Sequence, residues 1–185
     1  TMLFQEVIGQ SRIKAKLLRS LEQDKVSNTQ LFLGPEGSGT LPLALAFAQY
    51  LICAQPGKSD ACGQCSGCQK VQKLIHPDVH FAFPTVNRKD KREALSDEFI
   101  QEWRQAAISN PYLGLYDWLQ YIKAGNSQGN ISMKECREVL KKLSLKPFEG
   151  GKKVMVLWMP ELLGKEGNAL LKILEEPAPD TYFLL

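Results

Sequence analysis

The chain has 185 residues, of which 44% are hydrophobic and 23% charged, and its formal net charge is +3 at neutral pH. This length and composition are typical of a globular domain with a buried core. The slight positive charge does not by itself indicate a nucleic-acid-binding protein, and no apolar run approaches the roughly 18 residues that cross a bilayer. The first ten residues, TMLFQEVIGQ, do not resemble a signal peptide, so we expect a cytoplasmic protein with no membrane partner.

Hydrophobic periodicity in the first half of the chain predicts helices alternating with strands. Residues 10–23 carry apolar side chains four apart, which predicts an amphipathic helix. Residues 29–34 form a short apolar run that ends in glycine and predict a buried strand. Residues 41–54 are apolar almost throughout, as in a helix packed on a sheet, and residues 78–84 alternate like a second strand.

Residues 86–130 differ in character from the rest of the chain. They begin with a highly charged stretch, and residues 98–108 and 115–124 then predict two short helices that carry aromatic side chains. We interpret this segment as a partly helical insertion packed on the side of the core domain.

The last third of the chain returns to the alternating pattern. Ser132 and Glu135 have the spacing of a capping box and predict a helix, within which we expect Cys136 to be a core thiol. Residues 152–158 predict a strand, residues 167–176 a helix that ends before two prolines, and residues 181–185 the start of another strand. The sequence therefore predicts an α/β fold with a parallel sheet and helices on both faces. We expect one domain over residues 1–185, truncated C-terminally because the chain ends within a strand.

The turn at residues 34–39, GPEGSG, lies between a predicted strand and a predicted helix, which is the context of a phosphate-binding loop. The glycine positions of the G-x-x-x-x-G-K-[ST] pattern hold Gly34 and Gly39, with Gly37 between them. The lysine position holds Thr40 and the Ser/Thr position holds Leu41. The turn can still present backbone N–H groups to an anion. It lacks the charge that neutralises the β- and γ-phosphates and the hydroxyl that ligates Mg²⁺. The alternative to a degenerate phosphate-binding loop is an ordinary glycine-rich loop.

A second nucleotide element is expected where the strand at 152–158 ends. An acidic pair at this place holds Mg²⁺ and polarises the attacking water, but here the strand runs into Trp158 and Met159, with Glu161 as the nearest acid in sequence. Because two independent elements have lost their side chains, we expect no ATP hydrolysis and no bound ATP.

Four of the five cysteines lie within 16 residues, at Cys53, Cys62, Cys65 and Cys68. The C-x2-C spacing lets successive sulfurs converge on one ion, and four thiolates would close a tetrahedral structural zinc site. Disulfides and an iron–sulfur cluster are the alternatives, but clustered cysteines in a reducing compartment favour a metal. We expect a zinc-binding module over residues 53–68.

Several motifs together resemble the clamp-loader subunits of bacterial DNA polymerase III. They are IGQ at 8–10, the glycine-rich turn, the cysteine module, HPD at 76–78, REV at 137–139 and, most distinctively, NALLKILEEP at 168–177. The resemblance covers about residues 2–84 and 131–185. It implies a three-layer P-loop NTPase-like (AAA+) fold, in which residues 86–130 are a family-atypical insertion.

Within this family the chain looks like the delta-prime branch, which keeps the fold and the zinc module but commonly has a degraded nucleotide site. The resemblance implies a non-hydrolysing subunit of an assembly that loads the sliding clamp on primed DNA, with gamma/tau and delta subunits as partners. It also implies an arginine, in a Ser-Arg-Cys motif beyond Leu185, that is donated to a neighbour's ATP site.

Two alternatives remain open. An active ATPase of the gamma/tau kind is disfavoured by the residues at positions 40, 41, 158 and 159. A zinc-ribbon nucleic-acid-binding module is supported by the cysteines and by lysines at 141, 142, 152 and 153, which we interpret as a solvated face.

Overall fold

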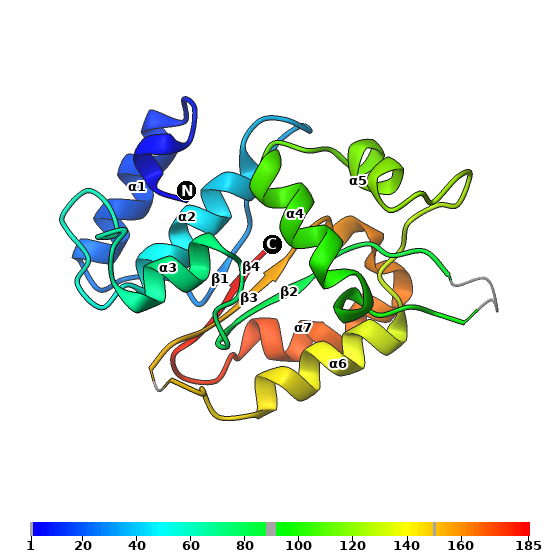
Figure 1. Cartoon of the computed structure of the whole chain (residues 1–185). Coiled ribbons are helices and arrows are strands. Elements are labelled where there is room, and N and C mark those ends of the chain that lie inside the picture. Colours follow the sequence, from blue (N-terminus) through cyan, green and yellow to red (C-terminus); the bar gives the residue numbers. More distant parts are fainter. Residues whose placement is uncertain (1, 88–91, 150) are drawn as a thin grey trace.

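The computed structural model describes residues 2–87, 92–149 and 151–185. Its centre is a parallel four-stranded sheet with the strand order β1-β4-β3-β2 (Figure 1). The strands are β1 (Thr29–Gln30), β2 (Val79–Ala82), β3 (Lys153–Leu157) and β4 (Thr181–Leu184).

Helices cover both faces of this sheet, so the predicted three-layer α/β fold class is confirmed (Figure 1). One layer contains α1 (Ser11–Glu22), α2 (Thr40–Ile52), α4 (Ile100–Ser109) and α5 (Leu115–Tyr121), and the other contains α6 (Met133–Ser144) and α7 (Asn168–Glu175). The short helix α3 (Ser66–Gln72) begins directly after Cys65 and contains Cys68. The 3-10 turns occupy Phe4–Glu6 (η1), Ser96–Phe99 (η2) and Pro160–Gly167 (η3). Among the described residues, no helix has the length and apolar character needed to cross a membrane.

The central strand β3 explains why both layers are required. All five of its residues are buried. Val154 and Val156 pack in the cluster formed with α2, whereas Met155 and Leu157 pack in the cluster formed with α6 and α7. Alternate side chains of a strand point to opposite faces, so a strand that is buried throughout needs cover on both faces.

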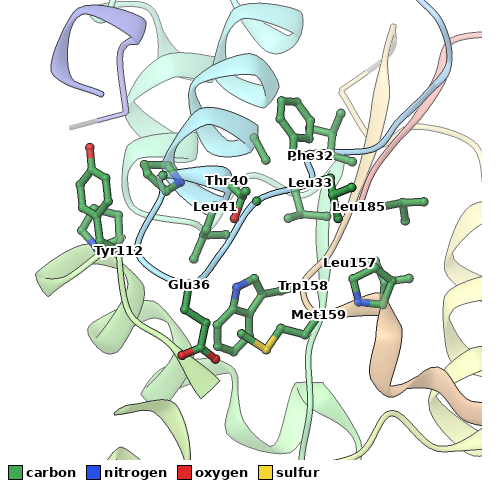
Figure 2. Close-up of a pocket in the computed structure, with 18 of the residues that line it drawn as sticks. Phe32, Leu33, Glu36, Thr40, Leu41, Tyr112, Leu157, Trp158, Met159 and Leu185 are labelled. Carbon is green, nitrogen blue, oxygen red and sulfur yellow. The ribbon is translucent and has the colours of Figure 1, made fainter. Parts of the chain in front are cut away.

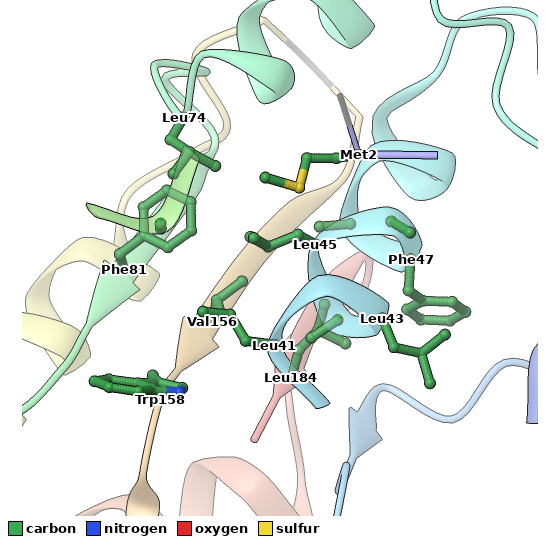
Figure 3. Packing of buried hydrophobic residues seen from close by; sticks show 14 of the residues in the cluster. Met2, Leu41, Leu43, Leu45, Phe47, Leu74, Phe81, Val156, Trp158 and Leu184 are labelled. Carbon is green, nitrogen blue, oxygen red and sulfur yellow. The ribbon is translucent and has the colours of Figure 1, made fainter. Parts of the chain in front are cut away.

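Helix α2 supplies most of the cover on its face. Ten of its thirteen residues are buried, and Leu45 and Phe47 are fully so. Figure 3 shows Leu41 and Leu45 directed from this helix toward Val156 of β3 and Leu184 of β4. Complete burial of a leucine or phenylalanine contributes about 1.5–3 kcal/mol, so this face is the main source of hydrophobic stabilisation.

The prediction of a buried strand over residues 29–34 was wrong in extent. The strand β1 has only two residues, and Leu31 and Leu33 are 64% and 87% exposed. The reason is that β1 lies at the edge of the sheet and pairs with β4 alone. The apolar residues of this segment therefore belong to an edge strand, one face of which is not covered by a helix.

The segment 86–130 contains the two predicted helices, α4 and α5, although residues 88–91 of its charged stretch lie outside the described residues. The expectation that this segment packs on the side of the core domain is incomplete, because its helices contribute side chains to the core itself. Trp103 of α4 and Trp118 of α5 are both fully buried in the cluster that contains α2 and β3. Their rings pack edge to face at 5.4 Å between centroids, and Phe83, just after β2, stacks on Trp103 at 4.5 Å. Large aromatic side chains gain most when they bury their area in the shared core.

The predicted helix start at Ser132 is confirmed, but only half of the capping box forms. The Ser132 hydroxyl accepts a hydrogen bond from the Glu135 N–H at 3.2 Å. The Glu135 carboxylate does not return the bond and instead accepts one from the Ser96 N–H at 2.7 Å. Burial raises the pKa of Glu135. The side chain predicted to cap its own helix therefore ties α6 to η2.

The lysines predicted to form a solvated face do not all do so. Lys153 is 2% exposed, and its ammonium donates hydrogen bonds to the carbonyls of Lys142, Leu143 and Leu145. Lys142 lies 2.7 Å from the carboxylate of Asp97. Carbonyl groups at a helix C-terminus lack partners within the helix and attract a cation. Lys153 thus caps the C-terminal end of α6 and does not belong to a basic surface.

Candidate functional site

The glycine-rich turn lies between β1 and α2, as the sequence predicts. Gly37 and Gly39 have positive φ angles of 75° and 94°, and Gly39 is the residue before the first turn of α2. Glycine alone adopts these angles without strain. A side chain at Gly39 would also crowd the ring of Tyr112, because a Cβ there would lie 3.3 Å from a ring carbon. The loop therefore keeps the backbone shape of an anion cradle at the N-terminus of a thirteen-residue helix.

The two positions after the last glycine carry different side chains from those that hold Mg·ATP. Thr40 begins α2 and lines the cavity described below, together with Gly34. Leu41 is 4% exposed and belongs to the hydrophobic core. An apolar side chain turned into the core cannot ligate a metal ion, so the place of the magnesium-binding hydroxyl has become part of the packing.

A cavity of about 420 Å³ lies between this turn and the carboxyl ends of β3 and β4 (Figure 2). In open α/β sheets, ligands bind outside these ends of the strands. The sequence-predicted residues Thr40, Leu41, Trp158 and Met159 all line this cavity. The structure thus brings together the two elements that the sequence analysis treated separately.

Trp158 and Met159 directly follow β3, at the place where a working nucleotide site has an acidic pair. The backbone N–H of Trp158 donates a hydrogen bond to the Ala82 carbonyl at 2.9 Å, which continues the pairing of β3 with β2. Its indole packs against Trp103, with 5.0 Å between ring centroids. Met159 has a φ of 59°, an uncommon value for a residue with a side chain. Neither side chain can hold magnesium or polarise a water molecule.

Two further cavity residues were missed by the sequence analysis. The Glu36 carboxylate accepts a hydrogen bond from the Leu115 N–H at 3.2 Å, and the Tyr112 hydroxyl accepts one from the Ile8 N–H at 2.7 Å. Figure 2 shows Glu36, Tyr112 and Trp158 around the cavity. The partners of the Glu36 bond are 79 residues apart in the sequence, and those of the Tyr112 bond are 104 residues apart. No local sequence pattern could therefore indicate these contacts.

The four clustered cysteines form a compact group of sulfurs. Their Sγ atoms all lie within 4.8 Å of one another, and the Sγ atoms of Cys62 and Cys68 are 3.9 Å apart. A tetrahedral ion with metal–sulfur bonds of about 2.3 Å requires sulfurs separated by about 3.8 Å. The cluster therefore has the size of a four-thiolate metal site, which these four residues could hold.

Backbone N–H groups point at the sulfurs and favour their thiolate forms. The amides of Cys62, Cys65 and Cys68 donate to the sulfurs of Cys53, Cys62 and Cys65 at 3.3–3.4 Å. Backbone hydrogen bonds from Gln64 and Cys65 lower the pKa of Cys62 to about 6. Burial raises the pKa of Cys53 and of Cys68. Two of the thiols thus resist ionisation, which a bound cation would offset.

The cysteine segment is fastened to the rest of the domain at two places. The Asp60 carboxylate accepts hydrogen bonds from the N–H groups of Phe4 and Gln5, both at 3.0 Å. On the other side, Lys70 of α3 pairs with Glu149, whose second oxygen lies 3.1 Å from His76 Nε2. The segment is therefore joined to both the start of the chain and the loop before β3.

The HPD motif at 76–78 has a structural role in this loop. The Asp78 carboxylate accepts hydrogen bonds from the N–H groups of Phe148 and Glu149, at 2.5 and 2.9 Å. The His76 ring accepts one from the Asp78 N–H through Nδ1 at 3.1 Å, and burial lowers the pKa of His76. These residues connect the amino ends of β2 and β3.

Comparison with known proteins relates this arrangement to a family. The family model described as DNA polymerase III, delta subunit, matches residues 9–185. The chain is 29% identical to the DNA polymerase III subunit delta′ of Escherichia coli (strain K12), over 92% of the chain and 39% of that protein. It is 34% identical to the delta′ subunit of Bacillus subtilis (strain 168), over 49% of the chain and 28% of that protein. It is also 25% identical to the subunit tau/gamma of Haemophilus influenzae (strain ATCC 51907 / DSM 11121 / KW20 / Rd), over 98% of the chain and 20% of that protein.

The chain spans only part of its relatives' length: 39% of the Escherichia coli delta′ subunit and 28% of the Bacillus subtilis one. The family match itself extends over nearly the whole chain and includes both the glycine-rich turn and the four cysteines. The chain belongs to the DNA polymerase III delta-subunit family, and its relatives include delta′ subunits.

Proposed function

We propose that this chain is part of a non-hydrolysing, delta-prime-type subunit of the replicative clamp loader. In this role it would help to load the sliding clamp on primed DNA, in an assembly with gamma/tau and delta subunits in the cytoplasm. The family membership supports the replication role, and the delta′ names of several relatives support the choice of subunit.

One observation carries the non-hydrolysing part of the proposal. The cavity beside the glycine-rich turn is lined by Thr40, Leu41 and Trp158 where magnesium and phosphate would need a lysine, a hydroxyl and a carboxylate. The backbone cradle persists, but none of the described side chains that line the cavity beside it carries a positive charge. Because some relatives are named tau/gamma subunits, an active ATPase subunit is the alternative function. ATP turnover distinguishes an active subunit from a non-hydrolysing one.

The test uses the loader reconstituted from this chain's full-length protein with the gamma/tau and delta subunits of the same organism. We expect that loading of the clamp on primed DNA requires this protein, whereas Thr40→Ala leaves the rate of ATP turnover unchanged. An equivalent alanine substitution at the phosphate-loop lysine of the gamma/tau subunit is the matched control and should abolish turnover. A loss of turnover in the Thr40 variant, or loading that is equally fast without this protein, contradicts the proposal.

We further propose that the four cysteines hold zinc in a structural role. Four sulfur ligands leave no open position for a water molecule, which is the arrangement of structural zinc sites rather than catalytic ones. Bound zinc would supply the positive charge that keeps the buried Cys53 and Cys68 ionised. Elemental analysis of protein purified without chelator should find about one zinc per chain. Iron in its place, or less than half an equivalent of metal, would contradict this assignment.

The described lysines give little support to a separate nucleic-acid-binding module. Lys153 is buried against the end of α6 and Lys142 is paired with Asp97. We therefore expect this chain alone to bind DNA weakly, with a shallow dependence of affinity on salt concentration.

A further inference from the structure

The cavity beside the glycine-rich turn has the opposite charge from the one that a phosphate site requires. Among the described residues that line it, the charged side chains are Glu36 and Glu161, and both are acidic. Glu36 belongs to the turn itself, and Glu161 follows the end of β3 in η3. A phosphate entering this cavity would meet negative charge where its binding needs positive charge.

Apolar and aromatic groups form most of the remaining wall. Tyr112, Trp158 and Met159 line the cavity together with Leu33 and Leu41 (Figure 2). A volume of about 420 Å³ lies within the range of small-molecule pockets. Aromatic ring faces attract organic cations, and the methionine thioether adds adaptable apolar contact.

The carboxylate of Glu36 is held in place by a neutral partner. One oxygen accepts the neutral N–H of Leu115 at 3.2 Å. The other lies so close to Gly114 that a Cβ on this glycine would be 2.5 Å from it. A neutral N–H orients the carboxylate without cancelling its charge. The cavity therefore presents a fixed anionic group beside an apolar wall.

We infer that this cavity binds a small organic cation, an ammonium or guanidinium group carrying an aryl or alkyl body. The cationic group pairs with Glu36, and the apolar body packs against Trp158 and Met159. This inference rests on the proposed loss of nucleotide binding at the same turn. It goes further because it names a different class of ligand for the cavity that remains.

The test compares three ligands of similar shape that differ in charge: 2-phenylethylammonium, 2-phenylethanol and 3-phenylpropionate. Affinities are measured by chemical-shift changes in protein amide spectra, with the Trp158 indole N–H as a local reporter. We expect the cation to bind about fivefold more tightly than the alcohol, as one exposed ion pair would give. The carboxylate should bind least well.

Variants assign the preference to a residue. Glu36→Gln keeps the shape and the hydrogen bond to Leu115 while removing the charge, and should reduce the preference for the cation to less than about twofold. Glu176→Gln, an equivalent change at an exposed residue outside the lining, should leave the preference unchanged. Equal binding of cation and alcohol, or a preference that survives in Glu36→Gln, overturns the inference.

A parallel titration with Mg·ATP keeps this test separate from the proposed function. Saturable binding of Mg·ATP at the turn would contradict the proposed loss of nucleotide binding. A missing preference for the cation, with Mg·ATP also unbound, would remove only the present inference.

Discussion

The carboxylate of Glu36, in the turn before α2, accepts a hydrogen bond from the backbone N–H of Leu115, the first residue of α5. The glycine-rich turn is thereby joined to a helix of the 86–130 segment. Tyr112, three residues earlier, reaches the N-terminal segment through the N–H of Ile8. The segment that was expected to be peripheral borders the cavity and holds its turn in position.

Replacing Glu36 by alanine should weaken the fold slightly through the loss of this bond. We expect Glu36→Ala to lower the free energy of unfolding by about 0.5–1 kcal/mol, the usual range for a side chain that caps a helix start, whereas Glu36→Gln should lose less than half of that. Urea denaturation provides the measurement. Glu161→Ala, at the other acidic residue of the cavity, is the control, and an equal loss in both alanine variants would speak against the Leu115 bond as the cause.

Removing the metal from the cysteine cluster should destabilise the chain. We expect a chelator to lower the melting temperature of the wild-type chain, since binding to the folded state is linked to its stability. Cys68→Ser should already be destabilised and no longer respond to the chelator. Cys136→Ala changes a cysteine that is equally buried but lies in the other core cluster, and it should still respond. A melting temperature that the chelator leaves unchanged in the wild type would refute a structural metal.

Acid should destabilise the chain through His80. Burial, reinforced by Lys142 and Lys153, lowers the pKa of His80 to about 4, against about 6.5 in an unfolded chain. Between about pH 6.5 and pH 4, His80 is protonated in the unfolded state but remains neutral in the folded state. The stabilisation is therefore complete above about pH 6.5 and is lost as the pH falls toward 4.

Between pH 7 and pH 5 this effect should amount to about 1–2 kcal/mol, allowing for partial exposure of the ring to solvent. Urea denaturation at the two pH values measures it. His80→Asn should show a correspondingly smaller decrease in stability than the wild type. An identical decrease in both proteins would assign the acid sensitivity to other groups.

The buried ammonium of Lys153 should matter far more than its neighbour in sequence. Lys153→Met leaves three carbonyls at the end of α6 without their donor, which we expect to cost about 2–3 kcal/mol of unfolding free energy. Lys152→Met, at an exposed position, should change stability by less than about 0.5 kcal/mol. Thermal and urea denaturation of the pair give the comparison, and similar values for the two variants would show that the capping contact contributes little.

The tryptophans of the 86–130 segment should behave as core residues. Trp118 is fully buried and its indole N–H donates to the Pro84 carbonyl at 2.7 Å, so Trp118→Ala should cost about 3–5 kcal/mol. Tyr116, two residues earlier, is 71% exposed, and Tyr116→Ala should be nearly neutral. If the segment were a separate attachment, Trp118→Ala would leave the main unfolding transition unchanged.

The fold was predictable from sequence wherever a pattern is local. The periodicity of α1, the apolar length of α2 and the Ser132 cap each depend on residues within one or two turns. Most of the cysteine cluster was predictable for the same reason, because the C-x2-C spacing of Cys62, Cys65 and Cys68 is a local pattern.

The remaining features depend on contacts between distant residues. Leu31 and Leu33 have the composition of a buried strand, but their exposure depends on the place of β1 at the sheet edge. Lys153 looks like a surface lysine until its distance from the end of α6 is known. Glu36 has no signal in the sequence, because its partner is a backbone N–H that any residue except proline would supply at position 115.

The bond between Asp60 and the N–H groups of Phe4 and Gln5 gives the cysteine segment an influence on the first turn of the chain. Phe4 is 2% exposed and packs in the main core, yet its backbone is held by a loop more than fifty residues later. A disturbance of that loop should therefore be detectable near the N-terminal end of the chain, as faster exchange of the Phe4 and Gln5 amide protons with solvent deuterium.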